Sequence, residues 1–360
     1  MALLLTFTAG LALLLLGAEL LVRGASRLAI GLGLAPILVG LTIVSIGTSA
    51  PELAIGIGGA LAGTPDIALG NVVGSNIANV LLILGLVAVV TSLVVHRQLV
   101  WLDVPLMIGA SLLVTGMALD GRISSAEGGL LMAGAAAYIG LLVWMAQRKP
   151  QQVPEDPALA QLPAPRVPRQ LLLMAAGLAM LVFGARWLVQ AATATAAALG
   201  LSELVIGLTV VAIGTSLPEI ATSVMAAVRG QRDLAVGNIV GSNIFNLLLV
   251  LGGTALVASD GVAVAPAALR FDLPVMTAVA VACLPIFFTG HCIRRWEGAL
   301  FLAYYAAYTA YLLMAAANHD ALDDFRLAMQ FVVLPLTTLT LVVVAWRQLR
   351  RRTHPNEDCA

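Results

Sequence analysis

The chain has 360 residues, of which 60% are hydrophobic and 11% are charged, and its formal net charge is zero. Soluble domains carry about 25% charged residues, so this composition excludes an ordinary soluble protein and indicates one that crosses the lipid bilayer many times. The sequence has no basic patch, which excludes nucleic acid as a partner, and none of its motifs predicts a cofactor.

Hydrophobic segments of membrane-spanning length follow one another along the chain, since one span needs about 20 apolar residues. The first five predicted spans lie near residues 2–22, 35–62, 69–94, 100–119 and 126–146. A polar, proline-rich segment at 148–169 is predicted to be an exposed linker. Five more spans are predicted near 170–190, 203–228, 235–258, 272–290 and 296–316. An eleventh, near 327–346, precedes a basic tail.

The first ten spans are two copies of five. A shift of 167 residues places Gly47-Thr48-Ser49 on Gly214-Thr215-Ser216, Pro51-Glu52 on Pro218-Glu219, Gly74-Ser75-Asn76 on Gly241-Ser242-Asn243, and Asn79 on Asn246. Because each copy has an odd number of spans, the second must enter the membrane upside down. We therefore predict an all-α integral membrane protein with ten core transmembrane helices in two inverted five-helix repeats, 1–147 and 170–316. The eleventh helix lies in a C-terminal region, 317–360.

The basic residues of the predicted loops gather on one side of the membrane. Numbering the loops alternately puts fifteen lysines and arginines on one side and three (Arg122, Arg270 and Arg326) on the other. The richer side is cytoplasmic by the positive-inside rule. We expect a multi-pass protein of the cell (inner) membrane, with the N-terminus outside and both the linker and the C-terminal tail in the cytoplasm.

A carboxylate, two hydroxyls and a proline interrupt the second span at residues 47–52 and the seventh at 214–219. A charge in mid-span costs several kcal/mol and by default marks a functional site. Proline frees the carbonyl four residues earlier, and helical spacing brings Thr48 and Ser49 close to Glu52. These hard oxygens suit Ca²⁺, Na⁺ or Mg²⁺. A kinked helix that merely tolerates a glutamate is the alternative, and its repetition in both halves argues against it.

A second repeated motif places serine and asparagine on one helix face. Ser75 and Asn79 are four residues apart, as are Ser242 and Asn246, so each pair shares a face. The remaining asparagines have two interpretations, ion contact or hydrogen bonding between helices; they are Asn71, Asn76, Asn238 and Asn243.

At these residues the chain resembles the cation/calcium exchanger superfamily, and within it the prokaryotic sodium/calcium exchangers. That family carries Gly-Thr-Ser-x-Pro-Glu on one helix and Gly-Ser-Asn-x-x-Asn/Asp on the next, and both copies of both motifs are present here. The resemblance implies two inverted repeats with four ion sites in a diamond at mid-membrane. It also implies alternating access by sliding of the first helix of each repeat, here 2–22 and 170–190.

Carried over by matching positions, the resemblance makes Glu52 and Glu219 the central Ca²⁺ ligands, assisted by the backbone carbonyls of Thr48 and Thr215. It assigns Na⁺ contacts to Ser49, Ser75, Ser216 and Ser242, together with the carbonyls of Ser45 and Ala212. Asn79 matches a site-lining asparagine. On the resemblance we expect ion contact for Asn246 as well as for Asn79. Asn246 stands where some relatives carry aspartate, and relatives with asparagine at this position still exchange cations.

The expected function is antiport of Na⁺ against Ca²⁺, because one Ca²⁺ or two Na⁺ neutralise the same two glutamates. The alternative is an antiporter that uses H⁺, depends on K⁺ or carries another divalent cation, since protons also neutralise carboxylates. An intramembrane protease would need a serine with a histidine or lysine base, or paired aspartates, and the predicted spans contain neither. We therefore predict that the protein is not an enzyme, and paired repeats suit alternating access better than a channel.

Overall fold

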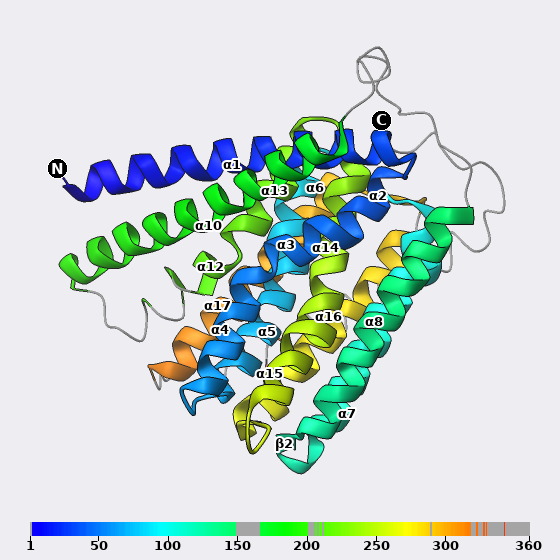
Figure 1. Ribbon diagram of the computed structural model, residues 1–360. Helices are drawn as coiled ribbons and strands as arrows, with labels where there is room; N and C mark the ends of the chain where they lie inside the picture. The colour runs from blue at the N-terminus through cyan, green and yellow to red at the C-terminus, as the bar shows by residue number, and fades with distance from the viewer. Residues whose placement is uncertain are drawn as a thin grey trace.

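The computed structural model describes residues 2–148, 166–200, 206, 209–210, 212–288 and 290–317, together with positions 322, 327, 329 and 342. Over these residues the fold is a helix bundle with two short antiparallel ribbons (Figure 1). Eight of the described helices are long and apolar enough to cross a membrane, or nine if one bent helix pair counts as a span. The all-helical membrane architecture is confirmed, whereas most of the predicted eleventh span and most of the linker lie outside the described residues.

The first half of the chain begins with one long helix and continues as segmented helices. The helical elements are α1 (Ala2–Leu32), α2 (Pro36–Val39), η1 (Gly40–Val44), α3 (Ser45–Thr48), α4 (Ala50–Leu61), α5 (Asp66–Ala78), η2 (Asn79–Leu84), α6 (Gly85–Val90), η3 (Leu99–Asp103), α7 (Val104–Met117), η4 (Ala118–Asp120) and α8 (Ser125–Arg148). The segments η1, η2 and η3 are π-helical, and η4 is a 3₁₀ turn. The strands are β1 (Leu93–Val94) and β2 (Arg122–Ile123).

The described part of the second half follows a similar order. Its helical elements are α10 (Val167–Ala198), α12 (Ala212–Thr215), α13 (Leu217–Val228), α14 (Arg232–Phe245), η6 (Asn246–Leu251), α15 (Gly252–Val257), η7 (Ala268–Asp272), α16 (Leu273–Phe288) and α17 (Arg295–Ala316), and its strands are β3 (Val262–Ala263) and β4 (Cys292–Ile293). Both α1 and α10 continue past the predicted span ends at 22 and 190. Arg23 and Arg27 therefore lie within α1 and not in a loop.

The two ribbons join the halves of the chain reciprocally. Strand β1, which follows α6, pairs with β4, which precedes α17. Strand β3, which follows α15, pairs with β2, which precedes α8. The helices exchange contacts in the same way, since α17 packs against α6 and α8 packs against α15. Each half thus completes its packing on the other.

The long helices α1 and α10 lie side by side and are strongly tilted relative to most of the other helices (Figure 1). Glycines allow this close approach. A Cβ atom at Gly17 would lie 2.7 Å from the carbonyl oxygen of Gly177, and one at Gly177 would lie 2.8 Å from that of Gly17. Gly10 and Gly184 face each other in the same way about two turns away. Small residues of this kind bring helix backbones into contact in membranes.

Two aspartates near the starts of spans bind tyrosines on neighbouring helices. The Tyr138 hydroxyl donates to Asp103 Oδ1 at 2.9 Å, and the Tyr308 hydroxyl donates to Asp272 Oδ1 at 2.9 Å. The same carboxylate–phenol contact therefore joins η3 to α8 in the first half and η7 to α17 in the second. It holds the outer helices around α5–η2 and α14–η6, which are the most deeply buried of the candidate spans.

Candidate cation-binding site

Both glutamates lie just after a break in their helices. The first break falls at Ser49, between α3 and α4, and the axes on its two sides differ by 41°. The second falls at Ser216, between α12 and α13. Pro51 and Pro218 occupy the first turns of the helices that follow, where proline is tolerated because no earlier carbonyl needs its N–H. Glu52 and Glu219 lie in those same first turns, where the helix dipole favours negative charge.

The predicted site residues form a buried polar region inside the apolar bundle. The Glu52 side chain is 1% exposed and that of Glu219 is 2% exposed. Of the other eight, Thr215 is partly buried and the rest are buried: Thr48, Ser49, Ser75, Asn79, Ser216, Ser242 and Asn246. The glutamates therefore face the protein interior and do not point into the acyl chains.

Thr48 is a point where the two halves meet. Its hydroxyl oxygen lies 3.3 Å from Asn238 Oδ1 and 3.5 Å from Ser242 Oγ. Helix α3, which carries Thr48, also packs against α13, which carries Glu219. The Glu52 and Glu219 carboxyl groups are near enough to interact electrostatically. The structure thus brings the Gly-Thr-Ser-x-Pro-Glu motif of one half against both motifs of the other.

Asn79 and Asn246 each begin a π-helical segment, η2 and η6 respectively. Such segments are rare and frequently occur at functional sites. Ser75 and Ser242 lie one turn earlier, as the spacing predicted. Each amide crosses to the other half: Asn79 Nδ2 lies 3.5 Å from Asn243 Oδ1, and Asn246 Nδ2 donates to Asn76 Oδ1 at 3.1 Å.

Six of the ten predicted residues keep a buried side-chain oxygen that has no hydrogen-bond partner among the described residues. They are Ser49, Glu52, Asn79, Ser216, Glu219 and Asn246. Buried polar atoms are normally satisfied, so each such oxygen needs an explanation. No group of three or more histidines, cysteines or acidic residues that could hold a metal occurs in the described part of the chain. A cation here would combine two carboxylates with hydroxyl, amide and carbonyl oxygens, the ligands that Na⁺ and Ca²⁺ take.

Two further residues of this region, Thr222 and Ser223, were not selected from the sequence, and Asn238, which has two interpretations there, contacts one of them. Asn238 accepts from Thr48 and donates through Nδ2 to Ser223 Oγ at 3.0 Å. Thr222 is fully buried, and its hydroxyl has no partner among the described residues. Thr222 and Ser223 follow Glu219 by three and four residues, a spacing that could have indicated a shared helix face. Thr222 and Ser223 are not part of the repeated motif, because Ile55 and Gly56 stand at the matching positions of the first half.

Comparison with known proteins points to one family. The family model described as "Sodium/calcium exchanger protein" matches residues 2–144 and 169–314. The chain is 39% identical over 314 residues to the putative antiporter CaxA of Alkalimonas amylolytica, with 85% of this chain and 97% of that protein covered. It is 32% identical over 338 residues to the sodium/calcium exchanger MaX1 of Methanosarcina acetivorans, with 84% and 96% covered.

Solved structures of the sodium-calcium exchanger NCX_Mj share the fold. One, from crystals soaked with 10 mM Na⁺ and 10 mM Sr²⁺, matches with a TM-score of 0.73 and 30% identity, covering 86% of this chain and 97% of that one. Another, soaked with 10 mM Na⁺ and no Ca²⁺, gives a TM-score of 0.72 at 29% identity and similar coverage. The chain therefore belongs to the sodium/calcium exchanger family, a family of membrane antiporters within the cation/calcium exchanger superfamily.

Proposed function

We propose that this protein exchanges Na⁺ for Ca²⁺ by alternating access, with Glu52 and Glu219 as the shared cation ligands. The observation that carries the proposal is the set of buried oxygens without hydrogen-bond partners, which come from both halves and include one oxygen of each glutamate. An unpaired buried carboxylate is strongly unfavourable, whereas one that coordinates a cation is not. The remaining predicted ligands, Thr48, Ser75, Thr215 and Ser242, complete the proposed site.

Exchange follows from the charge of this pair. Two ionised glutamates carry two negative charges, which one Ca²⁺ or two Na⁺ neutralise. The two kinds of ion therefore compete for the same ligands, and the empty charged site is costly to move through a low-dielectric interior. Transport in one direction then requires an ion to return in the other.

For the architecture we propose ten core helices in two inverted repeats, 1–147 and 170–316, joined by a cytoplasmic linker at 148–169. An additional helix and tail occupy 317–360. The reciprocal pairing of β1 with β4 and of β2 with β3 supports a two-fold relation between the halves. The glycine contact between α1 and α10 supports their movement as a pair during access changes, because the two helix backbones pack directly against each other at Gly17 and Gly177.

Location in the inner membrane, with the N-terminus outside and the C-terminus in the cytoplasm, is part of the proposal. The loop charges support the orientation. The inner membrane protein YrbG of Escherichia coli, 38% identical over 235 residues, supports the compartment.

Protons are the rival coupling ion, because a buried carboxylate can be neutralised by protonation. Hydroxyl and amide oxygens around the pair favour Na⁺, which needs several oxygen ligands, whereas a proton needs only the carboxylate. Ca²⁺ flux into proteoliposomes, with outward Na⁺, K⁺ and H⁺ gradients imposed one at a time at fixed buffer pH, separates the two. We expect uptake driven by the Na⁺ gradient. Uptake driven only by the pH gradient would establish the H⁺ alternative, and equal uptake without any gradient would exclude coupled exchange.

A further inference from the structure

Three buried asparagines form a series of hydrogen bonds that crosses between the two halves. Asn76 Nδ2 donates to the backbone carbonyl of Asn243 at 3.1 Å, and Asn76 Oδ1 accepts from Asn246 Nδ2 at 3.1 Å. All three side chains are at least nine-tenths buried. Among the side-chain nitrogen and oxygen atoms of these three residues, Asn246 Oδ1 and Asn243 Nδ2 have no hydrogen-bond partner within the described part of the protein.

Chemistry fixes which atom donates and which accepts in each hydrogen bond of this series. A backbone carbonyl can only accept, so Asn76 must turn its Nδ2 toward Asn243. Asn76 Oδ1 then faces Asn246. Because this amide oxygen can only accept a hydrogen bond, Asn246 must donate to it through Nδ2. The remaining atom of Asn246 is Oδ1, which is left free in the polar region one turn after Ser242.

The matching contact of the other half, between Asn79 and Asn243, is less constrained. Asn79 Nδ2 reaches Asn243 Oδ1 at 3.5 Å, which is at the limit of a hydrogen bond. The Asn243 amide is not held at its other end, because Nδ2 has no partner among the described residues. Asn243 lines a small cavity together with Asn76 and Ser111. Asn76 therefore holds the Asn246 amide more firmly than Asn243 holds the Asn79 amide.

We propose that Asn76 is a positioning residue for transport: by holding Nδ2 of Asn246, it turns the oxygen of that amide toward the transported cation. An amide that is free to rotate by 180° would present its NH₂ group, a donor that repels cations. This inference rests on the proposed function and deepens it, since it assigns to Asn76 a role in cation affinity without direct contact.

The test is a double-mutant cycle on the full-length protein in proteoliposomes, measured as apparent Ca²⁺ affinity (KM) under an outward Na⁺ gradient. Asn76→Ala and Asn246→Ala are each expected to raise KM about tenfold, the effect of one misdirected or missing buried polar group. The double variant is expected to match Asn246→Ala alone, because Asn76 acts only through Asn246. Ser111→Ala is the matched control. The Ser111 hydroxyl donates to Met107 O of its own helix at 2.9 Å and takes no part in the hydrogen bonds among the asparagines.

A second background separates positioning from a merely structural role. In Asn246→Asp both side-chain ends are oxygens, so no orientation is needed, and Asn76 Oδ1 now faces another acceptor. Adding Asn76→Ala to Asn246→Asp is therefore expected to leave KM unchanged or to lower it. In the native background, by contrast, Asn76→Ala is expected to raise KM. A structural defect would instead raise KM in both backgrounds and lower the thermal unfolding midpoint equally.

Asn243→Ala gives a further comparison, since it keeps the backbone carbonyl that holds Asn76. Its effect on KM is expected to add to that of Asn246→Ala. Additive effects of Asn76→Ala and Asn246→Ala, or the same effect of Asn76→Ala in the Asn246→Asp background, would overturn the positioning role while leaving exchange intact. Absence of Na⁺-driven flux in the unsubstituted protein would overturn the proposed function itself.

Discussion

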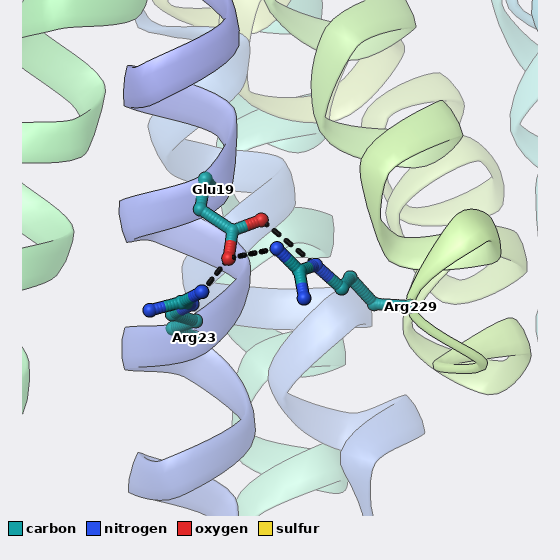
Figure 2. Close-up of polar contacts among 3 residues, drawn as sticks. All are labelled: Glu19, Arg23 and Arg229. Atoms are coloured by element: carbon teal, nitrogen blue, oxygen red, sulfur yellow. Dashed lines mark hydrogen bonds and ion pairs between the residues drawn. The ribbon is translucent and has the colours of Figure 1, made fainter.

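Arg229, at the end of α13, holds the carboxylate of Glu19 on α1 with two groups of its guanidinium (Figure 2). Its Nε donates to Glu19 Oε2 at 2.9 Å and its Nη2 donates to Oε1 at 2.6 Å. Arg23, one turn further along α1, pairs with the same carboxylate. The Arg229 pair therefore ties one of the two helices proposed to slide to the helix that bears Glu219, whereas the Arg23 pair stays within α1.

Arg229→Ala is expected to raise the maximal rate of Na⁺-driven Ca²⁺ uptake two- to fivefold, because in the proposed transport cycle α1 breaks this pair before it slides along the bundle. The magnitude corresponds to at most about 1 kcal/mol, since the Arg229 side chain is half exposed and solvent weakens the attraction. The apparent Ca²⁺ affinity should stay within twofold, since the pair lies outside the cation site. Initial rates of uptake into proteoliposomes over a range of Ca²⁺ concentrations measure both quantities.

Arg23→Ala is the matched control, because it removes a charge from the same carboxylate without untying two helices. An equal acceleration by Arg23→Ala would mean that local charge, and not the link between α1 and α13, sets the rate.

Glu52→Gln and Glu219→Gln are each expected to reduce Na⁺-driven Ca²⁺ uptake to background. Glutamine keeps the shape of the side chain and removes one of the two charges that a divalent cation needs. Size-exclusion profiles and thermal unfolding should remain near those of the native protein, because burying a neutral amide costs less than burying an unpaired carboxylate. Uptake near the native rate in both variants would exclude these glutamates as central ligands.

Gly177→Val is expected to destabilise the protein by about 1–3 kcal/mol, the usual cost of forcing extra carbon into a packed contact. A Cβ atom at Gly177 would meet backbone atoms of Gly17 and Leu21 at 2.8 Å, and backbone cannot move aside as a flexible side chain can. Thermal unfolding followed by fluorescence size exclusion measures the loss. Gly140→Ala in α8 is the control, since nothing lies within 4 Å of its added Cβ, and it should leave the midpoint unchanged or slightly raised.

A reporter fused to the C-terminus is expected to show a cytoplasmic tail. Green fluorescent protein fused after residue 360 should fluoresce, and alkaline phosphatase at the same point should be inactive, because the former folds in the cytoplasm and the latter in the periplasm. The reverse pattern would mean that the number of spans or the orientation derived from loop charge is wrong.

The sequence by itself determined the class of the protein and the identity of its motifs. Hydrophobic length and low charge decide membrane insertion locally, because each apolar segment partitions into lipid on its own account. The repeat can also be recognised from the sequence alone, since the motif that contains Glu52, with its proline and hydroxyls, recurs at a fixed shift around Glu219. These properties need no knowledge of which helix neighbours which.

Only the tertiary structure decided which groups meet. No local pattern predicts that Thr48 contacts Asn238 and Ser242, or that Asn76 donates to the backbone of Asn243, because these residues lie more than a hundred positions apart and meet only when the halves pack together. The extent of α1 and its link to Arg229 were also missed, since a helix can run beyond its apolar stretch when a neighbour satisfies its charges. Side-chain orientation across an interface depends on the partner surface, and that surface exists only in the folded bundle.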